Sequence, residues 1–92
     1  MKFEWDARKA SANLRKHRVS FGEATTVFAD PLARIHDDPQ HSAGELREII
    51  IGLAADGSLL LVSFSERGDT VRLIGARRAT AREKHEYEEA RK

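Results

Sequence analysis

Arginine is the side chain in this sequence best suited to chemistry, because its planar guanidinium can hold a phosphate group through two parallel N–H donors. Eleven of the sixteen basic residues are arginine. Residues 1–20 carry six bases against two acids, residues 67–84 carry six against two, and residues 21–66 carry two against eight. If the two basic segments meet in the fold, they form a site for an anion. The alternative is that the acidic segment neutralises them.

Within the second basic segment, Arg77 is the first candidate for holding an anion. It ends a run, 71–77, whose alternating pattern predicts the last strand, and a helix is predicted just after it. An ion pair between Arg77 and a helix acid is the alternative. The same alternation predicts that Arg72 and Arg78 share the other strand face, about 20 Å apart. Further candidates for anion contacts, with cross-strand pairing or a solvated helix face as the alternatives, are Arg47, Arg82 and Lys84.

Three residues are candidates for acid–base chemistry. His17 ends the first predicted helix, where a protonated imidazole is favoured, although a helix-capping role is the more common one. Glu83 closes a capping box that begins at Thr80, so its carboxylate has a structural role in any case. Tyr87 lies four residues further along the same helical face. Its phenol can donate to a phosphate, or it can pack in the core with its hydroxyl satisfied.

Several kinds of site are excluded or disfavoured. The chain has no cysteine, so disulfides, thiolate nucleophiles and cysteine metal sites are excluded. The chain contains neither of the glycine-rich nucleotide-binding motifs G-x-x-x-x-G-K-[ST] and G-x-G-x-x-G. Residues 36–41 read His-Asp-Asp-Pro-Gln-His and hold four possible metal ligands, but their spacing matches no strand or helix motif and favours a polar hairpin loop. We therefore expect neither a metal nor a cofactor, and metal-dependent hydrolysis through these residues stays open as the alternative.

The order of the elements predicts a single α+β domain over residues 1–92, since a chain of this length rarely divides into two cores. Asp6 is a candidate N-cap for a helix that ends near Lys16 or His17. The capping box Ser20-Phe21-Gly22-Glu23 predicts a second helix, which Asp30-Pro31 stops.

Strands follow at 32–36, 45–53, 58–64 and 71–77, with turns at Asp56-Gly57 and Arg67-Gly68-Asp69. With a short first strand and a last helix opened by Thr80, the expected order is β-α-α-β-β-β-β-α. The two middle strands are almost continuously apolar, which favours cover on both faces by helices or by a partner. Their apolar runs are too short to cross a bilayer, so we expect a cytoplasmic protein without a membrane contact.

Several short blocks follow one another along nearly the whole chain. They are Phe3-Glu4-Trp5-Asp6, Asn13-Leu14-Arg15-Lys16-His17, Val19-Ser20-Phe21-Gly22-Glu23-Ala24, Asp30-Pro31, Gly44-Glu45-Leu46-Arg47 and Arg72-Leu73-Ile74-Gly75-Ala76-Arg77, followed by Glu83 and Tyr87. In content, order and spacing these blocks resemble the BrnT toxins. Each block is weak alone, but the series is hard to obtain by chance.

This resemblance implies a RelE-like toxin fold, an antiparallel sheet of about four to five strands with two N-terminal helices and a C-terminal helix. It also implies a type II toxin–antitoxin system in which the toxin is a ribonuclease that arrests translation. The expected partner is a cognate ribbon-helix-helix antitoxin, and whether the toxin forms a homodimer within the complex stays open. DNA would be bound only through the antitoxin.

RNA carries its own nucleophile, the 2′-hydroxyl, so a small nuclease can cut it without a metal. It needs a cation on the phosphate, for which we expect Arg77, and an acid and a base among His17, Glu83 and Tyr87. The expected contacts to further phosphates come from Arg47, Arg72, Arg78, Arg82 and Lys84.

One position departs from the family pattern, since Gly75 stands where the family usually has serine. If the serine hydroxyl positions a phosphate, the present chain is either a slower enzyme or one that needs a bound water in place of that hydroxyl. Two alternatives therefore stay open, a module that binds RNA or protein through the same arginines without cutting, and an inactivated toxin that keeps only its antitoxin interface.

Overall fold

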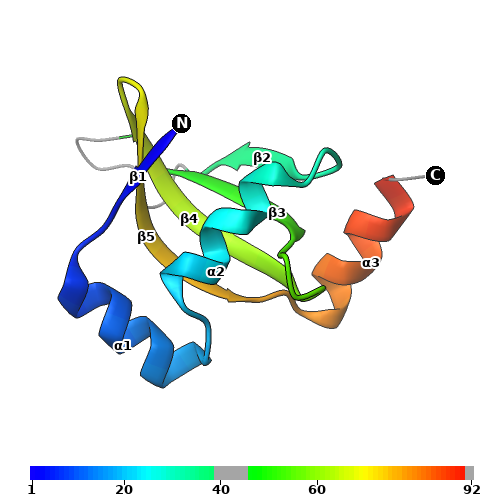
Figure 1. Cartoon of the computed structure of the whole chain (residues 1–92). Coiled ribbons are helices and arrows are strands. Elements are labelled where there is room, and N and C mark those ends of the chain that lie inside the picture. The colour runs from blue at the N-terminus through cyan, green and yellow to red at the C-terminus, as the bar shows by residue number, and fades with distance from the viewer. Residues whose placement is uncertain (39–45, 91–92) are drawn as a thin grey trace.

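A computed structural model describes residues 1–38 and 46–90 of the chain. The strands form one sheet in the order β1-β5-β4-β3-β2, in which β1 is parallel to β5 and all other neighbours are antiparallel. The elements are β1 (Lys2–Glu4), α1 (Ala7–His17), α2 (Phe21–Thr25), the 3-10 helix η1 (Thr26–Ala29), β2 (Arg34–Asp37), β3 (Glu48–Leu53), β4 (Leu59–Arg67), β5 (Thr70–Arg78) and α3 (Ala81–Ala90). The predicted α+β order is confirmed (Figure 1). The parallel pairing of β1 was not predicted.

The helix starts follow from their capping residues. Asp6 accepts hydrogen bonds from the backbone N–H groups of Arg8 and Lys9, at 2.8 and 3.1 Å, and α1 begins after it as predicted. Ser20 caps α2 by accepting from the Glu23 N–H. The reciprocal half of this second box is different, because the Glu23 carboxylate accepts from the Asp56 N–H in the β3–β4 turn instead. Glu23 thereby ties α2 to that hairpin.

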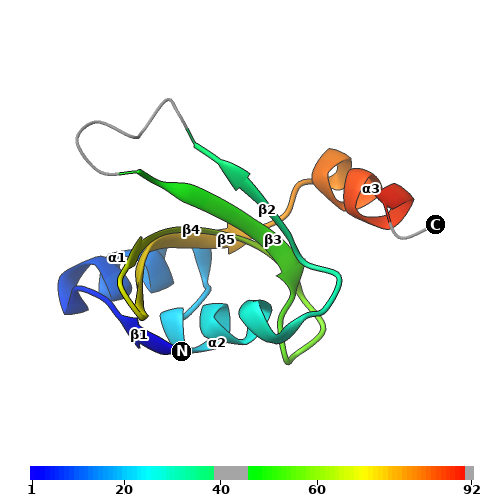
Figure 2. The same cartoon turned by 90° about the horizontal axis from the view of Figure 1, so that it is seen from above.

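Helices α1 and α2 lie on one side of the sheet, and α3 lies beyond the other end (Figures 1 and 2). Paired residues on neighbouring strands point to the same face. We call the side covered by α2 and η1 the helix face, which carries Leu60, Val62 and Phe64 of β4, and the other side the far face, which carries Leu61 and Ser63.

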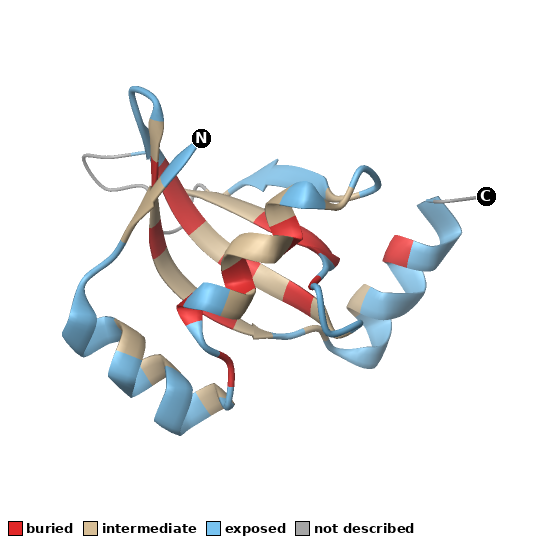
Figure 3. Ribbon diagram, in the orientation of Figure 1, coloured by how far each residue is buried: buried red, intermediate tan, exposed pale blue. Residues whose placement is uncertain are grey.

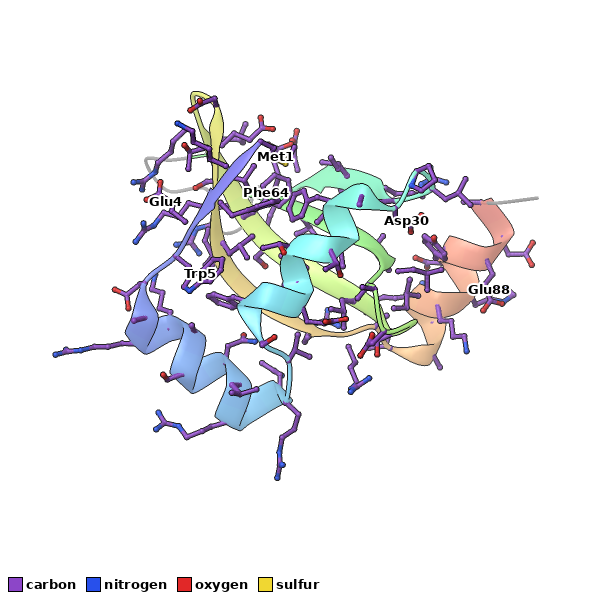
Figure 4. All side chains as sticks on the ribbon, viewed as in Figure 1. Met1, Glu4, Trp5, Asp30, Phe64 and Glu88 are labelled. Atoms are coloured by element: carbon purple, nitrogen blue, oxygen red, sulfur yellow. The ribbon has the colours of Figure 1, made fainter. Side chains whose placement is uncertain are left out.

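The core occupies the helix face. Buried side chains of α2, η1, β3, β4 and β5 form one cluster, and Figure 3 shows them as bands across the sheet and α2. Phe64 lies between the sheet and the helices (Figure 4), with its ring 5.1 Å from that of Phe28. On the far face, Leu61 and Ile49 are only half-buried. The expected complete cover of both faces is therefore not present in the described residues.

A bulge in β5 corrects the predicted strand faces. Ser63 pairs with Gly75 and Phe64 pairs with Leu73, so Ile74 is an extra residue without a partner in the ladder. The alternation changes phase at this point. Arg72 consequently lies on the far face with Arg77, whereas Arg78 lies on the helix face. The prediction that Arg72 and Arg78 share one face of the strand is therefore wrong.

Asn13 joins α1 to the edge of β5, where β1 no longer pairs. Its amide donates to the carbonyl of Ala76 (2.8 Å) and accepts from the Ala76 N–H (3.0 Å), as a neighbouring strand would. The amide also donates to the carbonyl of Val19 (2.9 Å). No helix among the described residues is long and apolar enough to cross a membrane.

Candidate functional site

Arg77 and Glu83 form a bidentate ion pair at the junction of β5 and α3. The guanidinium donates from Nη1 to Oε1 at 2.8 Å and from Nη2 to Oε2 at 3.0 Å. Glu83 is fixed by its own backbone as well, since Oε1 accepts from the Thr80 N–H and the Thr80 hydroxyl accepts from the Glu83 N–H. The predicted capping box at the start of α3 is thus present. The ion pair and the box hold the guanidinium in one position.

This arrangement makes Glu83 unsuited to proton transfer at neutral pH. The hydrogen bonds from Arg77, with those from Thr80, lower the pKa of the Glu83 carboxyl to about 2 against the opposing effect of burial. The same pair raises the pKa of Arg77. A carboxylate held this firmly is neither a useful acid nor a useful base near pH 7. Its geometry suits a different task, which is to orient Arg77.

Arg77 keeps donors for a ligand. A guanidinium has five N–H donors. Within the described residues two go to Glu83 and a third goes from Nη1 to the carbonyl of Arg78 at 3.3 Å. The edge formed by Nε and the second N–H of Nη2 has no acceptor there. The side chain is 38% exposed, so a phosphate can reach this edge.

Two rows of side chains cross the far face beside this pair. The pairing register places Arg34, Ile51, Leu61 and Arg77 in one row, and His36, Ile49, Ser63 and Gly75 in the next. The row ends lie three strands apart, or about 14 Å at the usual strand spacing. Arginines therefore stand at both ends of an apolar floor, and a histidine stands two residues from one of them.

The space between β2 and α3 is a groove of about 250 Å³. Its lining consists of Arg34, His36, Ile51, Glu83, Glu86 and Tyr87. His36 was predicted at the end of the strand 32–36 and as a possible metal ligand with the loop after it; it lies within β2 and lines this groove. Arg34 was missed altogether. Only the strand register shows that these two share a face with Arg77.

Tyr87 has the structural role that was its alternative. The residue is 3% exposed, and its hydroxyl donates to Oδ2 of Asp30 at 2.5 Å. Oδ2 of Asp30 also accepts from the Leu53 N–H, and Oδ1 accepts from the Leu32 N–H. Figure 4 places Asp30 at the end of the α2–η1 segment that is nearest α3. Tyr87 thus fastens α3 to the body of the protein.

His17 and Arg77 do not share a groove. His17 belongs to α1, which lies against the β5 edge on the helix side, whereas the Arg77 side chain lies on the far face. Helices α1 and α3 lie at opposite ends of the molecule in both views (Figures 1 and 2). The expected site of His17, Glu83 and Tyr87 around Arg77 is therefore not assembled. It is Arg78, on the helix face, that lines a groove with Arg18 at the end of α1.

The other predicted cations are scattered. Arg72 pairs with Glu4 at 3.1 Å, Arg78 donates to the Ser58 hydroxyl at 3.0 Å, and Arg82 lies 3.4 Å from Glu86 on the solvated side of α3. Lys84 is exposed on α3, and Arg47 is half-buried just before β3. Residues 39–41 of the possible metal loop and Glu45, the first residue of the predicted strand 45–53, lie outside the described residues.

No group of three or more histidine, aspartate or glutamate side chains that could hold a metal ion occurs among residues 1–38 and 46–90. No ligand set for a metal ion is therefore assigned within this part of the chain.

Comparisons with known proteins agree with this fold. The model of the BrnT family, described as the ribonuclease toxin BrnT of type II toxin–antitoxin systems, matches residues 5–83. The crystal structure of the Brucella abortus ribonuclease toxin BrnT superposes with a TM-score of 0.69 at 23% identity, covering 87% of this chain and 97% of that one. No match was found among curated proteins. With a family match over most of its length, this chain belongs to the BrnT family of ribonuclease toxins.

Proposed function

We propose that this BrnT toxin is a metal-independent endoribonuclease, in which Arg77 stabilises charge on the scissile phosphate and Glu83 orients Arg77. The observation that carries the proposal is the bidentate Arg77–Glu83 pair, which leaves one edge of the guanidinium open beside an apolar floor. A fixed donor aimed at developing charge needs no reorganisation during the reaction.

The chemistry would be transesterification within the RNA. A base removes the proton of the 2′-hydroxyl, the resulting oxygen attacks the adjacent phosphorus, and an acid protonates the leaving 5′-oxygen. The products are a 2′,3′-cyclic phosphate and a 5′-hydroxyl. Arg77 would hold the non-bridging oxygens, and Arg34, at the other end of the row, would hold a neighbouring phosphate.

His36 is our candidate for proton transfer in place of His17, Glu83 and Tyr87. An imidazole in general titrates closer to neutral pH than a carboxyl or a phenol does. The residue is exposed, lies on the far face, and lines the groove that contains Glu83. The partner acid or base would be supplied by a second group or by water.

Cleavage of a defined RNA in EDTA tests the proposal. We expect the wild-type protein to cut the RNA and to leave it intact when the scissile nucleotide is 2′-deoxy. Arg77→Ala should lower the rate constant about 100-fold or more, whereas Lys2→Ala, which removes an exposed cation paired with Asp69, should not change it. Cleavage of the deoxy substrate, or full activity of Arg77→Ala, would contradict the mechanism.

His36→Gln separates proton transfer from phosphate binding. Its rate constant should fall and lose one limb of the pH–rate profile, with the dissociation constant for an uncleavable RNA unchanged. A lower rate with an unaltered pH profile would remove His36 from proton transfer.

The expected partner is an antitoxin, as for any type II toxin. We propose that it is of the ribbon-helix-helix type, that it alone contacts DNA, and that two toxins pair within the complex. Exposed apolar side chains at the β2–β3 end of the sheet support a partner that covers this end, with Ile35 of β2 at 54%, Leu46 just before β3 at 59% and Leu53 of β3 at 38%. Co-expression with the neighbouring open reading frame, followed by size-exclusion chromatography with light scattering, tests the partner and the stoichiometry.

A further inference from the structure

Helix α1 carries a concentration of positive charge that the proposed cleavage site does not use. Residues 7–18 include five cations and no acid, namely Arg8, Lys9, Arg15, Lys16 and Arg18. All five are exposed, and none has an ion pair or a side-chain hydrogen bond within the described residues. Elsewhere in that part of the chain, Arg72, Arg77 and Arg82 are each paired with a glutamate.

Four of these cations share one side of the helix. Arg8 and Arg15, like Lys9 and Lys16, are seven residues apart, which is two turns and about 10 Å along the helix axis. At 3.6 residues per turn the two pairs flank Ala12. The half-buried residues of α1, Ala10, Asn13 and His17, lie on the opposite side, toward the sheet. The four cations therefore point away from the protein around a small, exposed alanine.

Arg18 supplies a separate observation. It ends α1 in the left-handed conformation, with φ 59° and ψ 29°, and its N–H donates to the carbonyl of Leu14. It is the one residue other than glycine with a positive φ in the described chain. Glycine or asparagine favours this position, because a Cβ is crowded there. The position therefore holds an arginine at the expense of stability, as functional positions commonly do.

We propose that this α1 surface, formed by Arg8, Lys9, Arg15, Lys16 and Arg18, binds the phosphate backbone of the RNA substrate at a distance from the cleavage site. The inference rests on the proposed RNA substrate and adds a second contact region to it. Because the α1 surface lies on the helix side and Arg77 on the far face, an RNA that contacts both must pass around the β5 edge. The α1 surface would then favour long or folded RNA.

Backbone phosphate fits this surface better than an acidic protein segment does. Protein interfaces need an apolar centre, and the space between the four cations contains only Ala12. Leu14, which is 48% exposed, lies to one side, in a hollow with Arg15 and Arg18. Glu23 and Asp56, the acids that line a groove together with Arg18, already accept backbone N–H groups. A repeating anion that needs no apolar contact is therefore the better match.

Trp5 adds a contact for a base. It lies where β1 meets α1 (Figure 4) and is 39% exposed, with its ring edge-on to Phe21 at 5.9 Å. An indole at the end of a track of cations is the combination found in proteins that bind single-stranded nucleic acid. A base stacked on Trp5 would leave its phosphate within reach of the first turn of α1.

Salt dependence of RNA binding tests the α1 surface without requiring cleavage. The probe is an RNA oligonucleotide with 2′-O-methyl groups throughout, which cannot be cut through its 2′-oxygens. For Arg8→Gln/Lys9→Gln/Arg15→Gln/Lys16→Gln, we expect the slope of log K against log salt to become less steep by about 0.7 for each lost phosphate contact, or about 3 in all. Lys2→Gln is the control and should leave the slope unchanged.

Arg18→Gly distinguishes binding from folding. Glycine relieves the left-handed conformation, so the melting temperature should rise while the slope decreases by about 0.7. If the slope is unchanged in both the quadruple glutamine variant and Arg18→Gly, the inference is overturned. It is also overturned if these variants bind RNA normally but no longer bind the antitoxin, because the α1 surface would then belong to the antitoxin interface. Should the quadruple variant fail to fold, Lys9→Gln/Lys16→Gln gives the same test with half the change. If the wild-type protein binds the probe through α1 but cuts no RNA, the proposed function fails and this inference stands.

Discussion

Replacing Glu83 by glutamine is the most direct test of the pair that organises the candidate site. Glutamine has nearly the same shape, and its side-chain oxygen can still accept from the Thr80 N–H in the capping box. The substitution therefore removes the charge opposite Arg77 and the acceptor of the Arg77 Nη2 hydrogen bond, and it leaves the helix cap in place. Any loss of stability then reports the ion pair rather than the helix cap.

The expected magnitude follows from the pKa of Glu83. The folded protein holds this carboxyl at about 2, against an ordinary value of 4.5. At about 1.4 kcal/mol per pKa unit, the difference corresponds to about 3 kcal/mol. Arg77 is 38% exposed, so solvent screens the pair and the measurable effect is smaller. We expect Glu83→Gln to lower the free energy of unfolding by about 1–2 kcal/mol at pH 7.

The pH dependence has a definite sign. Because the pKa is depressed in the folded state, the unfolded chain takes up the proton first as the pH falls. The stabilisation is present above pH 4.5 and is lost as the pH falls toward 2. Urea unfolding of wild type and Glu83→Gln between pH 7 and pH 3, followed by circular dichroism, should show a difference that narrows below pH 4.5. A difference that is absent, or equal at all pH values, would refute the reasoning. Glu86→Gln, from the exposed pair with Arg82, is the control and should show no measurable change.

Three further substitutions test the framework around the site. Asn13→Ala leaves the N–H and C=O of Ala76 without their Asn13 partners and should lower the free energy of unfolding by about 2–4 kcal/mol. Ser11→Ala, at an exposed position of the same helix, is its control in urea unfolding. A decrease in unfolding free energy no larger than that of the control would contradict the bridging role. Gly52→Ala should lower the free energy of unfolding by about 1–3 kcal/mol, because the new Cβ would lie 2.9 Å from Ala33 Cβ and 3.0 Å from Asp30 Oδ2. Gly22→Ala, with its nearest contact at 3.9 Å, is the control and should be tolerated. Equal melting temperatures of the two variants would show that the segment Asp30–Ala33 adjusts to the new Cβ. At Gly75 a Cβ would meet only Asn13 Oδ1, at 3.8 Å, so Gly75→Ser should fold normally. Because this variant restores the residue usual in the family, it should cleave RNA faster than the wild-type protein. A slower or unstable variant would show that the glycine is required.

The sequence predicted the structure correctly where that structure depends on residues close together in the chain. Asp6, Ser20 and Thr80 each cap a helix because their side chains reach N–H groups two or three residues ahead. Gly57 and Gly68, at φ 89° and 62°, occupy the predicted turns. The same local signals predicted the order of the elements correctly.

The sequence was insufficient where the outcome depends on strand register. One extra residue at Ile74 changes the face of every later side chain, and this alone separates Arg72 from Arg78. Gly75 was a signal, because a glycine inside a strand pattern often marks a bulge. His36 and Arg34 gave no comparable signal, since their place beside Arg77 depends on the pairing of four strands. Asn13 gave a weak one, since asparagine is unfavourable inside a helix unless its side chain has a partner.

Helix α3 connects the two halves of the candidate site. Within the described residues, its side-chain bonds to the rest of the protein include two that are one turn apart, from Glu83 to Arg77 and from Tyr87 to Asp30. Asp30 is itself fixed by the N–H groups of Leu32 and Leu53, so it positions the start of β2 and the end of β3 together with α3. The groove that His36 lines is bounded by these same elements. A change at the buried Tyr87 hydroxyl would therefore shift Glu83, and with it the guanidinium of Arg77, relative to His36. We therefore expect Tyr87, an acid–base candidate in the sequence, to act on the site through the position of Glu83.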